Sequence, residues 1–193
     1  FSTFRRTSAL ERPLAVAVGN LIVGYNEDAT GDDVRTGSHN VVVGVEHSWT
    51  SFSGLLAGYN NTVSGEYASV TGGNDNTASG IYSSVSGGWT NAATGDSASV
   101  SGGRQNSSTH NSASISGGAA GVASGEYSSI SGGSNNIASG YYGSVLGGST
   151  NTASAFDSSV SGGQWNVASG QGASIVTVQP PENPADVGKF GQG

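Results

Sequence analysis

The sequence predicts an all-β protein, a parallel β-solenoid whose coils are about 15 residues long. Three features support this fold: glycine pairs that recur at a constant spacing, a column of β-branched residues with the same period, and a column of small residues half a coil away. A fixed period of this kind is typical of stacked structural repeats. The glycine pairs begin at residues 72, 87, 102, 117, 132, 147 and 162.

The repeating unit reads G-G-x-x-N-T-A-S-G-x-Y-S-S-V-S, and its positions are numbered here from the first glycine. A unit of this length suffices for two short strands and two tight corners, with neighbouring coils about 4.8 Å apart. The glycine pairs are expected to supply the positive φ that the corners demand. Because side chains alternate along a strand, positions 12 and 14 should point inward, toward the small residue at position 7. Position 14 holds Val70, Val85, Val100, Ile115, Ile130, Val145, Val160 and Ile175.

Asparagine forms another column, at position 5. Stacked asparagine side chains can hydrogen-bond along the axis, and asparagine tolerates left-handed corner geometry, so a structural ladder is expected. The alternative is a row of ligand-binding amides. Gly121 interrupts the column, which otherwise consists of Asn61, Asn76, Asn91, Asn106, Asn136, Asn151 and Asn166.

The chain divides into four predicted segments. Residues 59–178 form the regular solenoid, and residues 19–58 form irregular early coils that are more apolar, as expected of a terminal or interface region. Residues 1–18 do not follow the repeat and are expected to be a cap or connector. Residues 179–193 contain three of the four prolines, which cannot continue a ladder, and are expected to form an arm or linker.

Composition and charge narrow the function classes. The chain has 33 glycines but no G-X-Y period, which excludes collagen, and it has no cysteine, which excludes disulfides. A formal net charge of −7 provides no basic footprint for nucleic acid. No apolar run is long enough for a membrane-spanning helix. The first residue is phenylalanine and not methionine, so a processed or partial chain is expected, with any targeting segment outside it.

Few residues are candidates for catalysis or metal binding, and the sequence predicts no catalytic residue, no metal site and no cofactor. His39 and His47 lie in the irregular early coils, eight residues apart, and the chain has no cysteine to complete a metal site. His110 takes the place of a corner glycine and is expected to occupy a turn. The acidic insert at 26–33 is similar to a calcium loop, but Gly37 occupies the place of the bidentate glutamate, so a solvated loop is expected. Acidic residues in the repeats are scattered, which argues against a polysaccharide-cleaving enzyme.

Aromatic residues give the candidate binding surface. Position 10 includes Ile81, Tyr141 and Phe156, and corners at positions 3 and 4 hold Trp89 and Trp165. Tyrosine beside a corner suits a binding surface, and the alternative is packing against the next coil. Position 11 holds the tyrosine candidates Tyr67, Tyr82, Tyr127 and Tyr142.

Units such as residues 78–87 resemble the head repeats of trimeric autotransporter adhesins, the YadA-like heads, whose pattern is similar to A-T-G-x-x-S-V-A-I-G. The early segments 20–24 and 40–44 match the S-V-A-I-G strand best. The resemblance covers about residues 19–178. It implies a left-handed β-roll in an extracellular, homotrimeric, non-enzymatic head that attaches cells to matrix or surfaces. The coils here are one residue longer than the commonest family unit, and position 6 offers the best partly apolar trimer seam.

Other functions remain open at this point. The same solenoid would serve as a subunit of an extracellular filament or a phage-type tail fibre, whose ends bind neighbouring subunits. Rows of serine and threonine could also order water, as in an ice-binding solenoid, but the chain has no T-x-T ladder. An extracellular or cell-surface location and a homo-oligomer are expected under the first two interpretations.

Overall fold

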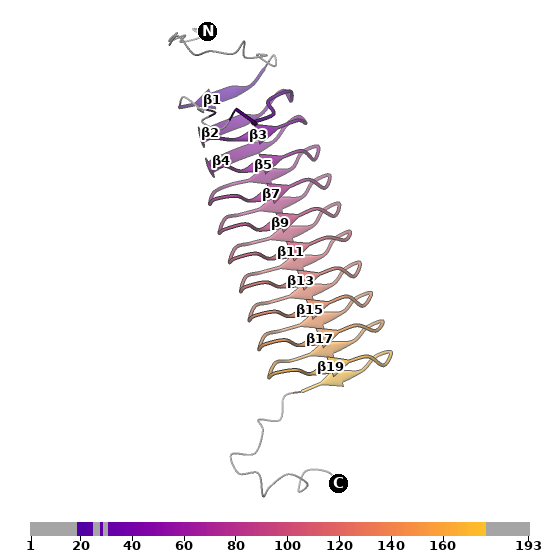
Figure 1. Ribbon diagram of the computed structural model, residues 1–193. Coiled ribbons are helices and arrows are strands. Elements are labelled where there is room, and N and C mark those ends of the chain that lie inside the picture. Colours follow the sequence, from indigo (N-terminus) through magenta and orange to yellow (C-terminus); the bar gives the residue numbers. More distant parts are fainter. Residues whose placement is uncertain (1–18, 25–27, 29–30, 177–193) are drawn as a thin grey trace, which may run out of the picture.

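The computed structural model describes residues 19–24, 28 and 31–176. These residues form a parallel β-solenoid with 15-residue coils in its regular part, and none of them is helical. Figure 1 shows the coils stacked into a rod, with a corner on either side of the strands. The predicted cap at 1–18 and the predicted arm at 179–193 both lie outside the described residues.

Two parallel sheets form the body of the rod. Sheet A has 11 strands and sheet B has nine, and successive coils pair within each sheet. Sheet A contains β1 (Leu21–Val23), β2 (Val41–Val45), β4 (Leu55–Tyr59), β6 (Ser69–Val70), β8 (Ser84–Val85), β10 (Ser99–Val100), β12 (Ser114–Ile115), β14 (Ser129–Ile130), β16 (Ser144–Val145), β18 (Ser159–Val160) and β20 (Ser174–Ile175). Sheet B contains β3 (Ser48–Trp49), β5 (Thr62–Val63), β7 (Thr77–Ala78), β9 (Ala92–Ala93), β11 (Ser107–Ser108), β13 (Val122–Ala123), β15 (Ile137–Ala138), β17 (Thr152–Ala153) and β19 (Val167–Ala168).

The register places identical positions of the repeat beside one another. Val100 pairs with Ile115, for example, and Ala93 pairs with Ser108. The inward orientation predicted for positions 7, 12 and 14 is confirmed, because these residues are buried between the sheets in the regular coils. In the last described coil Ala173 and Ile175 are only partly buried, since no described coil lies beyond them.

The asparagine column forms a buried ladder, with a geometry that differs from the expected one. From Asn61 to Asn151, the Oδ1 of each ladder asparagine accepts a hydrogen bond from the backbone N–H of the next residue of the column, as Asn76 does from Asn91 at 2.9 Å. The Nδ2 group of Asn76 donates to the carbonyls of Gly72 and Gly88, at 3.2 and 3.0 Å. Each amide therefore joins three backbone groups of two coils, and the ladder is structural.

The expectation that these asparagines adopt left-handed geometry is wrong. Positive φ falls one residue earlier, at position 4, where Asp75 has a φ of 56°. The ladder asparagines do not have positive φ, and the backbone N–H of Asn76 donates to Oδ1 of the preceding Asn61 at 2.8 Å. The glycine pairs do supply positive φ, and they supply it at their second residue: Gly103 has a φ of +88°, whereas Gly102 does not have a left-handed φ.

His47 is a ladder member that the sequence did not reveal. It takes the place of an asparagine one coil before Asn61, and its Nδ1 accepts the backbone N–H of Asn61 at 3.1 Å. Nε2 donates to the carbonyl of Val43 at 3.2 Å. Burial lowers the pKa of the His47 imidazole. This keeps the ring neutral, the form in which Nδ1 can accept a hydrogen bond.

Gly121 is the one break in the regular ladder, and filling it should stabilise the protein. Its N–H donates to Asn106 at 2.9 Å, but the described residues provide no acceptor for the N–H of Asn136. Gly121 does not have a positive φ, and a Cβ there would meet Asn106 Oδ1 at 3.1 Å and the side chain of Ile130 at 3.6 and 3.8 Å, without any backbone clash among these nearest atoms. We expect Gly121→Asn to raise the free energy of unfolding by about 1–2 kcal/mol, because three hydrogen bonds form in a buried site.

Urea unfolding followed by circular dichroism measures this effect. Gly117→Ala is the matched control, because a Cβ at Gly117 would meet nothing within 4 Å. An unchanged or lower midpoint for Gly121→Asn, relative to this control, would mean that the site does not accept the amide.

Candidate functional site

One corner of the rod, formed by positions 10 and 11, carries an exposed row of aromatic and acidic side chains that we call the tyrosine edge. Tyr67, Tyr82, Tyr127 and Tyr142 are 47, 62, 45 and 48% exposed. All four have a φ near 58°, which is costly for a bulky residue. The same φ occurs at position 11 of the coils that carry Ser97, Ser112 and Asp157, so it is a requirement of the corner. What distinguishes the tyrosines is that large rings are exposed there.

The rings of the tyrosine edge form two groups. In the first, Tyr67 and Tyr82 stack with centroids 5.1 Å apart, and Phe52 meets Tyr67 edge-on. In the second, Tyr127 stacks on Tyr142 at 5.2 Å. The second group continues through position 10, where Tyr141 and Phe156 stack at 5.6 Å. The rings thus pack against neighbouring coils and also stay exposed, and the binding interpretation stays a prediction.

Phe52 is a member of the edge that sequence reasoning missed. It lies in an irregular coil, and its carbonyl accepts the N–H of Tyr67 as the carbonyl of Glu66 accepts that of Tyr82. The irregular steps between the early coils hide this equivalence from a search for a single fixed period.

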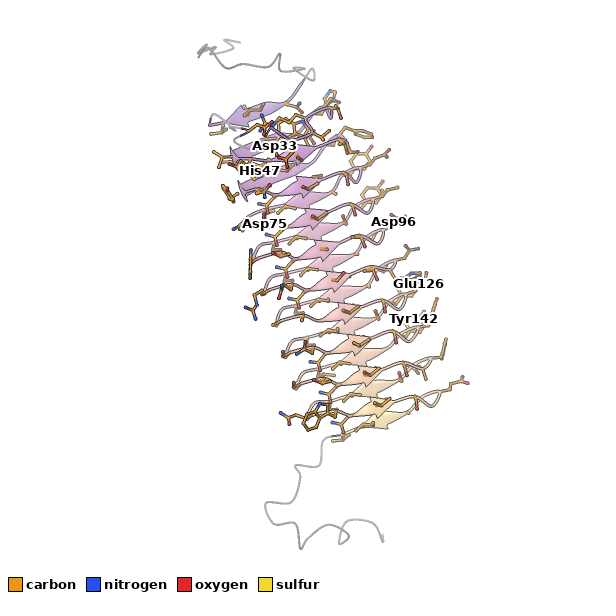
Figure 2. All side chains as sticks on the ribbon, viewed as in Figure 1. Asp33, His47, Asp75, Asp96, Glu126 and Tyr142 are labelled. Carbon is orange, nitrogen blue, oxygen red and sulfur yellow. The ribbon has the colours of Figure 1, made fainter. Side chains whose placement is uncertain are left out.

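Carboxylates accompany the rings along the same corner. Glu66, Asp96, Glu126 and Asp157 occupy positions 10 or 11. Figure 2 shows Asp96, Glu126 and Tyr142 on one side of the rod and Asp75 on the other. Partial desolvation, the hydrogen bond with Tyr142 and the charge of Glu126 all raise the pKa of the Tyr141 phenol. The tyrosine edge is thus a negatively charged aromatic surface.

The two tryptophan candidates belong to a different corner. Trp89 is 45% exposed, and its Nε1 lies 3.4 Å from Asp75 Oδ2. Trp165 is 74% exposed and follows β18, near the C-terminal end of the described coils. The six aromatic candidates therefore do not form one surface, and the tryptophans have no ring contact with the tyrosine edge in the described residues.

The early coils carry a separate apolar surface on the outer side of sheet A. Leu21, Val23, Val41, Val43 and Leu55 project from β1, β2 and β4 and are 59, 51, 38, 38 and 37% exposed. We call this surface the apolar face. In later coils of the same sheet, serine takes the place of Leu55, at Ser69 and beyond.

The remaining polar candidates are an acidic cluster and two exposed histidines. Carboxylate oxygens of Asp28, Asp32 and Asp33 lie within 4.8 Å of one another, as hard-cation ligands would. Asp33, however, pairs with Arg35 and accepts a hydrogen bond from Ser48, so this chain supplies its own cation there. His39 and His110 are both exposed. His39 lies in the early coils, whereas His110 is at position 9, next to the tyrosine edge in the coil that carries Asn111 and Ser112.

Comparison with known proteins gives no assignment, since neither the protein-family models nor the curated protein sequences contain a match to this chain. Among the described residues, no helix has the length and apolar character needed to cross a membrane.

Proposed function

We propose that this protein is an attachment module, the head of an extracellular bacterial surface protein that binds a matrix or surface partner through the tyrosine edge and performs no catalysis. The observation that carries the proposal is the row of exposed tyrosines, stacked in two pairs along one corner of the rod. Tyrosine is enriched at protein interfaces because it offers a large apolar area and a polar hydroxyl at a low entropic cost.

The architecture supports this function because it can hold a binding surface rigidly. Hydrogen bonds join each coil to the next in both sheets, and the buried asparagine ladder adds a third line of bonds. Rings on successive coils are therefore presented at a fixed spacing, which lowers the entropy that a partner's binding must overcome. A rod that keeps its shape suits attachment at a distance from a cell.

The resemblance to YadA-like heads supports an extracellular homotrimer. We assign contact between copies of this chain to the apolar face of sheet A in place of position 6 of sheet B, the seam expected from the sequence, because aliphatic side chains are exposed and contiguous over β1, β2 and β4. Contiguous exposed apolar surface of this kind marks protein–protein contacts. The left-handed roll implied by the family forms part of the same proposal.

Attachment is tested with inert beads coated with the protein and passed over immobilised matrix proteins and glycans. Many copies on one bead reveal weak binding through avidity. We expect retention on at least one surface, and its loss with the double variant Tyr82→Ser, Tyr127→Ser. Trp89→Ser is the control and should be retained as the unchanged protein is. Retention of the double variant, or no retention on any surface, would contradict the proposal.

A filament subunit is the second candidate, and one observation favours it. β19 and β20 are the last strands of their sheets and have a hydrogen-bonded neighbour on one side within the described residues. Such edges can pair with another chain. Light scattering and negative-stain imaging separate the two assemblies: a trimer supports the head, ordered filaments support the fibre, and a monomer contradicts both.

A further inference from the structure

The stack of rings on the tyrosine edge is interrupted for two coils. Tyr82 stacks on Tyr67 on its N-terminal side, and Tyr127 stacks on Tyr142 on its C-terminal side. Between them, position 11 holds Ser97 and Ser112. The ring faces that Tyr82 and Tyr127 turn toward these serines have no ring partner among the described residues, and Tyr82 is the most exposed tyrosine of the row.

The two coils that lack a ring at position 11 carry a negative charge beside the gap. Asp96 precedes Ser97 at position 10, and its Oδ1 accepts a hydrogen bond from the backbone N–H of Ile81 at 3.0 Å, which orients the carboxylate. Glu126 follows on the far side, beside Tyr127. The arginines of the described residues are Arg35, which pairs with Asp33, and Arg104, which is at the opposite corner, and these residues include no lysine. The complementary ligand therefore carries positive charge.

The geometry of the interruption suits arginine in particular. The guanidinium group is planar, stacks on aromatic faces and pairs with carboxylates, whereas the lysine ammonium is a compact point charge. Tyr82 and Tyr127 are three coils apart, which places their rings roughly 14 Å apart along the axis. A guanidinium stacked about 3.5–4 Å from each ring leaves roughly 7 Å between the two groups. Side chains two residues apart on one face of an extended strand have nearly this spacing, about 6.5–7 Å.

We propose that the interruption binds an extended basic segment of a partner protein, in which two arginines separated by one residue stack on Tyr82 and Tyr127 and face Asp96. This proposal rests on the attachment function proposed above and names the chemistry of the partner. The binding segment lies along the rod axis, and its backbone contributes no specificity beyond the spacing of the two arginines.

The probe is a fluorescent peptide, acetyl-Gly-Ser-Arg-Ser-Arg-Ser-Gly-amide, and binding is measured by fluorescence anisotropy. Its isomer with adjacent arginines has the same charge and composition, and a third peptide carries lysine in place of arginine. We expect the first peptide to bind about tenfold more tightly than either of the others, because only it places two planar cations at the spacing of the rings.

Variants taken from the chain's own repeat keep the fold intact. Serine occupies position 11 at Ser97 and Ser112, so Tyr82→Ser and Tyr127→Ser are compatible with the corner. Asn111 occupies position 10, so Asp96→Asn is as well. Each of the three variants should weaken binding of the first peptide about tenfold, and Trp89→Ser should leave it unchanged. The two tyrosine variants remove a ring without altering the net charge, so they separate ring stacking from electrostatic attraction.

Equal affinity for all three peptides, or equal binding by the tyrosine variants, would overturn the proposal. Failure here is distinguishable from failure of the attachment function. If coated beads are retained through Tyr82 and Tyr127 but the peptide neither binds nor competes, attachment stands and the arginine segment is wrong. Retention on a neutral glycan surface would likewise overturn the cationic partner while supporting attachment.

Discussion

Gly103→Ala is expected to lower the free energy of unfolding by about 3–5 kcal/mol, whereas Gly102→Ala should leave it unchanged or slightly raise it. A Cβ at Gly103 would lie 2.2 Å from the carbonyl oxygen of Gly118 and 2.6 Å from Asn106 Nδ2. Neither atom can retreat, because the carbonyl belongs to the next coil and the amide belongs to the buried ladder. The left-handed φ of +88° adds strain to any residue with a side chain.

Gly102 is a stringent control because it is the adjacent residue of the same pair. A Cβ at Gly102 would meet nothing within 4 Å, and its φ is not left-handed. Urea unfolding monitored by circular dichroism compares the two variants directly. Similar midpoints for Gly102→Ala and Gly103→Ala would show that the next coil leaves room for a side chain at the second glycine of the pair, contrary to the prediction.

Asn91→Ala is expected to lower the free energy of unfolding by about 3 kcal/mol, because it removes three hydrogen bonds from a buried site. Oδ1 of Asn91 accepts the N–H of Asn106 at 3.0 Å, and Nδ2 donates to Gly87 and Gly103 at 3.0 and 2.9 Å. Gly103 keeps the N–H of Trp89 as a donor at 3.0 Å, so the cost falls on the other two groups. The N–H of Asn106 is buried and the carbonyl of Gly87 is partly buried, and both lose this partner.

The measurement is again the urea midpoint, with Asn111→Ala as the control because Asn111 is exposed at a corner. We expect the control to change the free energy of unfolding by less than about 0.5 kcal/mol. The natural break at Gly121 indicates that the rod folds with one ladder residue missing, so the variant is expected to be measurable. Equal midpoints for the two variants would mean that the hydrogen bonds of the ladder contribute nothing to the stability of the protein.

The aromatic candidates show how far the sequence reaches into the site. The position of the four tyrosines in one column followed from the constant period, because residues at the same position of stacked coils are neighbours. Their division into two groups, the inclusion of Phe52 and the separation of the tryptophans required the structure. These features depend on ring orientation and on the direction in which each corner projects, neither of which a period specifies.

The sequence alone determined the coil length, the parallel pairing and the inward positions, since a chain with a fixed short period buries the same small and β-branched residues in each coil. The tertiary structure decided which backbone group each asparagine binds, which glycine of a pair carries the left-handed φ, and that His47 continues the ladder. The reason is that these outcomes depend on how peptide groups of adjacent coils face one another. In the early coils the step from one strand of sheet A to the next departs from the regular period, so their register emerges only from strand pairing in three dimensions.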